Sequence, residues 1–209
     1  LHGEAYLIRF ADDFICCFEL ESDAERYQSV LIKRLARFSL SVAEEKTKLI
    51  RFGRFARRDS QRRGEGAPST FDFLGFTFRA RKTSWLGRIY AHGFLPAASP
   101  KALKAISRTI RRWTLHHRSD KALADLATLV NPTIRGWITY YGSFYRTQLR
   151  PTLKRIDLYV IRWARRKFKR LRRKTKGVRD WFDRLRRANP MLFAHWQLCH
   201  GNGRTSGAV

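Results

Sequence analysis

Two adjacent carboxylates, Asp12 and Asp13, are the residues whose type and spacing best suit chemistry in this sequence. They lie between two apolar runs, 6–10 and 14–18, that are typical of β-strands, so we expect a β-hairpin with the pair in its turn. Carboxylates at a hairpin tip can hold Mg²⁺, a hard cation that prefers oxygen ligands. Asp is also a common turn residue, so ordinary turn chemistry is the alternative interpretation.

The charge of the chain favours the metal interpretation. With 44 Lys and Arg against 17 Asp and Glu, the formal net charge is +27, which indicates a polyanionic partner. Asp12 and Asp13 nevertheless lie in an acidic patch that opens the chain. Carboxylates near nucleic-acid phosphates need divalent ions between them, and two such ions clamp the attacking and leaving oxygens in phosphoryl transfer.

The charge is divided unevenly along the chain, which indicates two domains. Residues 1–100 contain 17 basic and 12 acidic residues, whereas residues 101–190 contain 26 and 5. Two prolines in the segment 94–101 mark a boundary between these parts. We expect one domain over residues 1–97, a second over 98–200, and a disordered tail over 201–209.

The fold class expected is α+β, with short strands and one helix in the first domain. Ser22 and Glu25 have the spacing of a capping box, and the apolar spacing behind them predicts a helix over about 23–38. Strands are expected over 39–42, 47–53 and 70–81, with 85–95 as the antiparallel partner of the last. Residues 64–69 are expected to form a mobile basic loop.

The second domain is expected to be all-helical. Helical spacing predicts helices over 100–117, 120–130, 132–146, 151–175 and 178–188, with Asn131-Pro132 as the start signal of the third. The basic run 162–176 lacks acids, so its charges repel one another unless a phosphate backbone neutralises them. Aromatic residues around Trp137 and Tyr140 could stack on bases, but their helical spacing favours a place in the core.

Several other classes of protein are disfavoured. Three cysteines, two of them adjacent, do not make a disulfide framework, and we expect a reducing, intracellular setting. The spacing of Cys16, Cys17, Cys199, His195 and His200 does not match a zinc site. Neither a signal peptide nor an apolar run long enough for a membrane span is present in the sequence.

Five blocks, taken in order, resemble those of reverse transcriptases encoded by group II introns. Phe10-Ala11-Asp12-Asp13 resembles the Tyr-Ala-Asp-Asp box, with Phe10 in place of tyrosine. Two further blocks, 35–48 and 71–76, are similar to the next blocks of the palm and its primer grip. The last two, 131–144 and 162–170, are similar to the thumb, or maturase-specific, region of these proteins. The resemblance extends over roughly residues 5–196.

This resemblance implies part of a reverse-transcriptase palm, with an antiparallel sheet and a helix, followed by an all-α thumb bundle. It implies that Asp12 and Asp13 are catalytic residues that hold two Mg²⁺ ions. The third carboxylate would come from an upstream segment, because the chain begins at Leu1 as a fragment would. Lys46 would lie near the phosphates of the incoming nucleotide, or else be an ordinary surface lysine. The primer grip would contain Phe73, Leu74 and Gly75, and the RNA-binding residues would be Arg135, Arg162, Arg165, Arg166, Lys169, Arg170 and Arg173.

The function implied is that of an RNA-directed DNA polymerase and intron maturase. Its partners would be structured group II intron RNA, an RNA template with a DNA primer, and deoxynucleotides. The present fragment is expected to be inactive as a polymerase on its own, and to reside in a bacterial-type cytoplasm or an organelle. The alternative is a non-catalytic RNA-binding maturase or a degenerate remnant. A two-metal nuclease is disfavoured, because no further carboxylate or histidine cluster accompanies the Asp-Asp pair.

Overall fold

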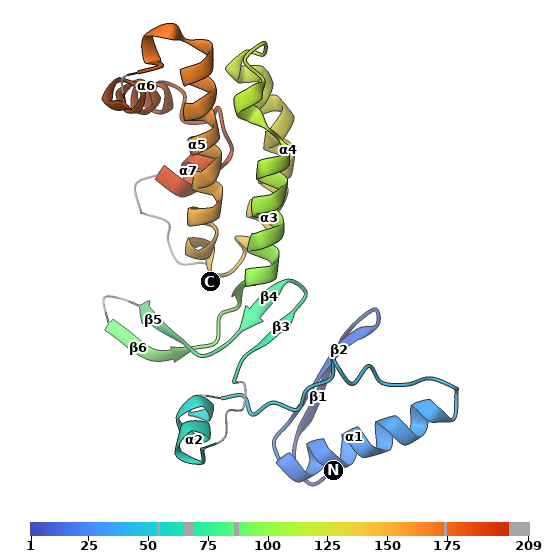
Figure 1. Cartoon of the computed structure of the whole chain (residues 1–209). Coiled ribbons are helices and arrows are strands. Elements are labelled where there is room, and N and C mark those ends of the chain that lie inside the picture. The colour runs from blue at the N-terminus through green and yellow to red at the C-terminus, as the bar shows by residue number, and fades with distance from the viewer. Residues whose placement is uncertain (54, 65–68, 86–87, 174, 201–209) are drawn as a thin grey trace. The chain divides into compact units, whose positions relative to one another are not determined.

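The computed structural model of the chain describes residues 1–53, 55–64, 69–85, 88–173 and 175–200 (Figure 1). The described residues form an α+β protein, as expected, with small antiparallel sheets and a helical part. The chain divides into two compact units, one over Leu1–Phe73 and one from Leu74 onward. The expected change from strands to helices falls within the second unit, where the helices begin at Pro100.

The first unit begins with the expected hairpin. Strands β1 (Ala5–Phe10) and β2 (Asp13–Phe18) are antiparallel, and their register runs from Ala5 opposite Phe18 to Phe10 opposite Asp13. The turn therefore consists of Ala11 and Asp12 rather than Asp12 and Asp13. Ala11 takes the left-handed conformation with a φ of 52°. This shift puts Asp13 into the ladder, where it is paired with Phe10.

Helix α1 (Glu21–Ala36) follows, but it begins before the capping box expected at Ser22. Leu20 is its N-cap, without a side-chain cap. The Asp23 carboxylate instead accepts hydrogen bonds from the backbone N–H groups of His2 (2.7 Å) and Gly3 (2.9 Å). These contacts lower the pKa of Asp23, the hydrogen bond from Gly3 most of all. Asp23 thus fixes the start of the chain to the helix.

The rest of the first unit differs from expectation. Residues 39–42 and 47–53 form loops rather than strands, because a strand sequence becomes a strand only where a neighbour pairs with its backbone. Helix α2 (Ala56–Arg62) was not expected. Most of the expected basic loop, residues 65–68, lies outside the described residues, as does the expected tail 201–209.

The segment 70–81 was expected to be one strand but is interrupted by a turn. It forms β3 (Phe71–Phe73) and β4 (Phe76–Phe78), and its last residue begins β5 (Arg81–Trp85). Strand β6 (Arg88–Gly93) pairs with β5, whereas β4 pairs with β7 (Ala97–Ala98), so the expected partner of β4 was wrong. Leu74 and Gly75 interrupt the segment with φ values of 49° and 77°.

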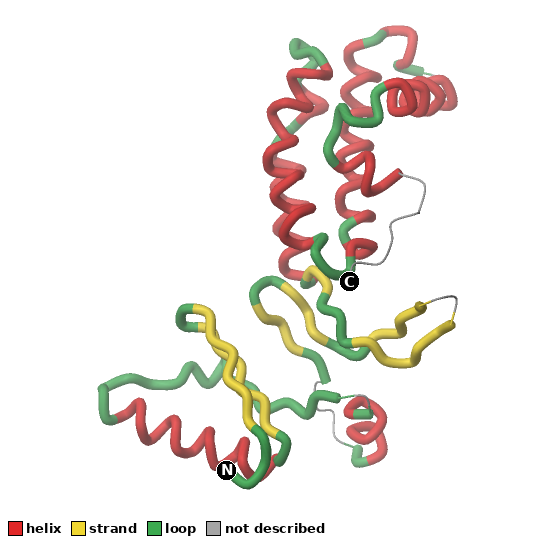
Figure 2. The backbone as a smooth tube through the Cα atoms, turned by 180° about the vertical axis from the view of Figure 1, so that it is seen from behind, coloured by secondary structure: helices red, strands yellow, loops and turns green. Residues whose placement is uncertain are grey.

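The helical part of the second unit consists of α3 (Pro100–Arg112), η1 (Leu115–His117), α4 (Leu123–Tyr141), η2 (Arg146–Gln148), α5 (Arg150–Lys167), η3 (Lys169–Leu171), α6 (Thr175–Ala188) and α7 (His195–His200). Ser99 caps α3 by accepting a hydrogen bond from the backbone N–H of Ala102, and Pro100 is its first residue. Helices α3, α4 and α5 run alongside one another (Figures 1 and 2). They bury a shared core that includes Ile110, Leu126, Ile134, Leu153, Ile156, Val160 and Trp163.

Several expected helix boundaries were wrong: α3 ends at Arg112, α4 ends at Tyr141, and α6 begins at Thr175. Two further differences have a visible cause. Asn131-Pro132 does not start a helix but lies inside α4, because the Asn131 side chain is buried against another segment. Its amide donates a hydrogen bond to Leu192 O (2.9 Å), and its Oδ1 accepts one from Ala194 N (2.9 Å). Helix α5 was expected to reach residue 175 but ends at Lys167, where Phe168 becomes extended (φ −108°, ψ 111°).

Candidate functional site

The Asp12-Asp13 pair lies at the exposed tip of the β1–β2 hairpin. The Arg9 guanidinium donates a hydrogen bond from Nε to Ala11 O (2.7 Å) and so supports the turn. Two exposed carboxylates are a suitable, though incomplete, set of oxygen ligands for Mg²⁺. Among the described residues, no group of three or more His, Cys, Asp or Glu side chains is placed to hold a metal ion. A complete site therefore requires a ligand from elsewhere.

Lys46 is exposed in the loop after α1. Its backbone N–H donates to Ala43 O (3.0 Å), which closes a local turn. Within the described part of the chain, no ion pair joins Lys46 to Asp12 or Asp13. A role of Lys46 beside a nucleotide therefore stays a prediction.

Two tyrosines of α4 contact the turn expected to form the primer grip, and the sequence did not predict this contact. The Tyr140 hydroxyl donates a hydrogen bond to Leu74 O (2.9 Å). At Gly75, an added Cβ would meet the Tyr141 hydroxyl oxygen at 3.1 Å, so this residue is restricted both by its positive φ and by space. Phe73, half-buried, ends β3 just before the turn. The local signal for the turn was Leu74-Gly75, but nothing local pointed to α4.

Aromatic residues at the end of α4 gather around Phe76. The Phe76 ring centroid lies 5.3 Å from that of Tyr140, 5.6 Å from that of Tyr141 and 5.5 Å from that of Phe144. Trp137 instead stacks on Trp113, at 5.4 Å between centroids. These contacts agree with the expected packing role, although Tyr140 and Phe144 each remain 50% exposed.

The expected RNA-binding cations at the end of α5 are all exposed, and they fall into two groups. In the first group, the side chains bind backbone carbonyls and close the end of the helix. Arg165 donates to Arg172 O (3.0 Å from Nη2), and Arg166 donates to His116 O (3.3 Å) and contacts His117 Nδ1 (2.7 Å). These contacts give Arg165 and Arg166 a structural role.

The cations of the second group are exposed and are not hydrogen-bonded to other described residues. The side chains of Lys169, Arg170 and Arg173 have no hydrogen bond or ion pair to another described residue, and Arg162 lies over the Tyr159 ring (5.4 Å). Because α5 ends at Lys167, Lys169 and Arg170 lie on η3, and Arg173 lies in the loop after it. Burial, and after it the charges of His117, Arg166 and Arg162, lowers the pKa of His116. The neighbourhood is therefore electropositive.

Arg135, the remaining expected RNA contact, lies on α4, away from this group in sequence. It is exposed and makes no hydrogen bond or ion pair with any other described residue. Gly136 beside it is open, since an added Cβ would meet nothing within 4 Å. The structure thus presents the expected cations on α4, α5, η3 and the loop after η3, all in the helical part of the second unit, the helical unit from Pro100 onward.

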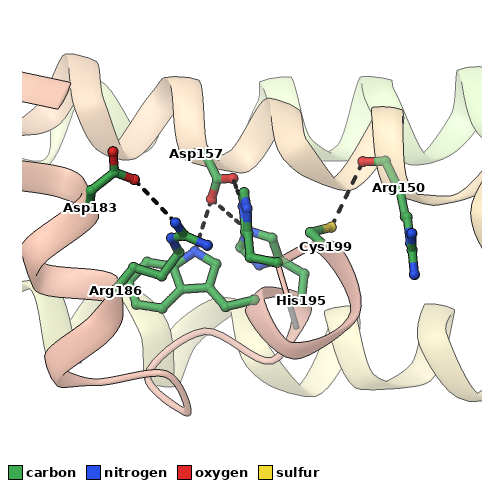
Figure 3. Close-up of polar contacts among 8 residues, drawn as sticks. Arg150, Asp157, Asp183, Arg186, His195 and Cys199 are labelled. Atoms are coloured by element: carbon green, nitrogen blue, oxygen red, sulfur yellow. Dashed lines mark hydrogen bonds and ion pairs between the residues drawn. The ribbon is translucent and has the colours of Figure 1, made fainter. Parts of the chain in front are cut away.

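A buried polar network that sequence reasoning missed fastens α7 to α5 (Figure 3). Asp157 Oδ1 accepts hydrogen bonds from His195 Nε2 (2.8 Å) and Trp196 Nε1 (2.9 Å), and Oδ2 accepts one from His200 Nε2 (2.9 Å). Burial raises the pKa of Asp157, but these contacts outweigh it, so the pKa lies below its usual range. Burial also raises the pKa of the Cys199 thiol to about 12, which makes it unreactive.

The comparisons with known proteins concern the helical unit. Residues 103–190 match the family model described as group II intron, maturase-specific domain. None of the curated proteins matches the chain. In the described part of the chain, the helices are too short or too polar to span a membrane.

Proposed function

We propose that the chain assists splicing by binding structured group II intron RNA through its helical unit, because residues 103–190 match the family model of the group II intron maturase-specific domain. One observation supports the binding surface. Lys169, Arg170 and Arg173 are exposed within the matched segment, and no carboxylate neutralises them among the described residues. Unpaired cations that repel one another gain most from a phosphate backbone, which replaces their mutual repulsion by attraction.

The dependence of RNA affinity on salt tests this surface. Each phosphate contact releases condensed counterion and contributes about −0.7 to −0.9 to the slope of log K against log salt. Changing Lys169, Arg170 and Arg173 together to Gln should therefore flatten the slope for intron RNA by about 2 to 3 units. The matched control removes three exposed cations, Lys33, Arg34 and Arg37, from the end of α1 and its flank. An equal change in both variants would show that only the total charge counts.

The proposal also assigns a polymerase function to the first unit. Asp12 and Asp13 would hold Mg²⁺ together with a carboxylate from an upstream segment, and the bound ions would supply electrostatic stabilisation of the phosphoryl transfer from a deoxynucleotide to a primer 3′-OH. The turn at Phe73, Leu74 and Gly75 would position the primer, and Tyr140 and Tyr141 would hold Leu74 and Gly75 in place. Lys46 would contact the nucleotide phosphates. The resemblance of the Phe10–Asp13 box supports this assignment, and DNA synthesis by Asp12→Asn tests it.

A non-catalytic maturase is the second candidate. The observation that favours it is the position of the family match, which lies wholly within the helical unit and contains neither Asp12 nor Asp13. RNA binding and assistance of splicing then require only the second unit. Primer-extension assays in a protein that includes an upstream palm segment separate the two candidates, because a binding-only protein has no DNA synthesis for Asp12→Asn to remove. Splicing activity should survive this substitution in both candidates.

A further inference from the structure

An open cleft of about 440 Å³ lies on the helical unit between α4 and the segment that leads into α7. This volume is within the range of small-molecule sites in proteins. Residues from both sides line it, among them Arg135, Ile138 and Thr139 from α4, and Met191, Phe193 and Gln197 from the opposite side. The cleft is therefore formed by residues about 55 positions apart in the sequence.

Hydrogen bonds hold the segment opposite α4, residues 191–197, at two places. Asn131, one helical turn before Arg135, binds the backbone of Leu192 and Ala194. Further along, Asp157 binds His195 and Trp196 and thus holds the start of α7 on α5. Because this segment is held in place in the free protein, a ligand does not pay for ordering it. The cleft is a preformed site rather than a gap between loosely packed elements.

The groups around the cleft suit a nucleotide. Of the lining residues that the structure describes, Arg135 alone is charged, so the site attracts an anion. A guanidinium binds phosphate oxygens with two parallel N–H groups. Met191 is 69% exposed at the rim and offers a polarizable surface for an aromatic ring. The Gln197 amide contacts Met191 Sδ, a weak acceptor that a base oxygen or nitrogen can replace. Thr139 adds an exposed hydroxyl.

We propose that this cleft binds one unpaired nucleotide of the RNA, with the base between Met191 and α4 and a phosphate on Arg135. The inference rests on the proposed RNA-binding function and adds to it a preference for single-stranded segments. A-form duplex RNA keeps its bases stacked and its edges enclosed, whereas the bases of loops and bulges can leave the stack. The basic group on η3 then supplies affinity for any RNA backbone, and the cleft distinguishes unpaired from paired RNA.

Equilibrium binding of two RNA probes to the full chain tests the proposal. The probes are an RNA hairpin with an unpaired loop of six uridines and a fully paired duplex of the same number of phosphates. Thr139→Trp fills the cleft from an exposed position, and Arg135→Gln removes its charge. Thr139→Trp should weaken binding of the looped probe about tenfold, the loss of about one stacked base. Arg135→Gln should weaken it by about the same factor through the loss of a charge-assisted phosphate contact. Each should change duplex binding less than about twofold. The control is Arg108→Gln, an exposed cation on α3 that does not line the cleft.

The outcomes separate this inference from the proposed function. If the wild-type chain binds both probes but Thr139→Trp and Arg135→Gln leave the looped probe unaffected, the inference is wrong and the RNA-binding function stands. Equal weakening for both probes at an unchanged Tm would also overturn it, because the cleft would then be ordinary backbone-binding surface. Failure of the wild-type chain to bind either probe would overturn the RNA-binding function itself.

Discussion

The two units of the chain bury very different amounts of apolar surface. In the second unit, helices α3, α4 and α5 each contribute fully buried residues, among them Ile110, Val130 and Ile156. In the described part of the first unit, Ala24 is the one buried hydrophobic residue, while large side chains are exposed throughout. These exposed side chains include Tyr6, Leu7, Ile8, Phe10, Phe14, Val30, Ile32, Phe38, Phe52 and Phe55.

This difference shows where the stability of the chain comes from. Burial of apolar surface contributes roughly 25 cal/mol per Å² and is the main force that stabilises a fold. A two-stranded hairpin with one helix and little burial is marginally stable by itself. The helical unit is therefore stabilised by its own core. The hairpin that carries Asp12 and Asp13 has little buried apolar surface, so its stability depends on further contacts that bury its strands. The residues proposed for chemistry thus lie on the unit with little buried core, and the residues proposed to bind RNA lie on the unit with an extensive core.

The largest expected effect separates chemistry from affinity. In a protein that includes an upstream palm segment, Asp12→Asn should reduce DNA synthesis by orders of magnitude, because a neutral amide is a poor ligand for Mg²⁺. RNA affinity should stay nearly unchanged, since the proposed binding residues lie in the other unit. Primer extension and filter binding measure the two quantities on one preparation. Near-normal DNA synthesis by this variant would contradict the polymerase assignment.

Truncation of a large apolar side chain to alanine should lower the free energy of unfolding much more in the helical unit than in the first unit. Trp163 is 2% exposed and donates a hydrogen bond from Nε1 to Arg118 O (2.9 Å). Trp163→Ala should lower the free energy of unfolding of the helical unit by about 3–5 kcal/mol, as for other buried aromatics. Leu7→Ala, at a position 63% exposed, should cost less than about 0.5 kcal/mol. Urea unfolding followed by circular dichroism gives both values, and similar costs would refute the contrast.

The Asp157 network should make the helical unit sensitive to acid. Because the folded pKa of Asp157 lies below its ordinary value of 3.8, its contribution is fully present above that value and is lost as the pH falls through the folded pKa. Asp157→Asn should cost about 2 kcal/mol at neutral pH, since hydrogen bonds to a charged acceptor are replaced. It should also remove part of the destabilisation at low pH. Thermal unfolding between pH 3 and pH 7 measures this, and identical pH profiles would contradict the role of Asp157.

Two glycines of the second unit should have small effects of opposite sign on its stability. Gly75→Ala should destabilise by about 1–2 kcal/mol, because φ is +77° and the Tyr141 hydroxyl is 3.1 Å from the new Cβ. Gly136→Ala should stabilise by about 0.5–1 kcal/mol, because it lies inside α4 in open space. Differences in Tm measure both. A stabilising Gly75→Ala would show that the turn before β4 is not held by Tyr141.

Much of the molecule could be predicted from local sequence patterns. The β1–β2 hairpin, the existence of α1, and a helix that starts near residue 151, which is α5, are all confirmed. Each of these depends on residues near one another in the chain, since strand alternation and the helical repeat place neighbours on a common face. The uneven charge of the two halves follows from composition alone. The motif resemblance in the helical region also needed no structure, and the match over 103–190 confirms it.

Other features were decided by contacts between distant residues. Asn131-Pro132 has the local pattern of a helix start, but α4 continues through it because Asn131 binds backbone groups 61 and 63 positions further along. Asp157 lies 38 positions from His195, and nothing near either residue in the sequence indicates the pair. The end of α5 at Lys167 and the strand partner of β4 belong to the same class. Local propensities differ by only about 1 kcal/mol per residue, so burial and long-range hydrogen bonds of similar or larger size override them.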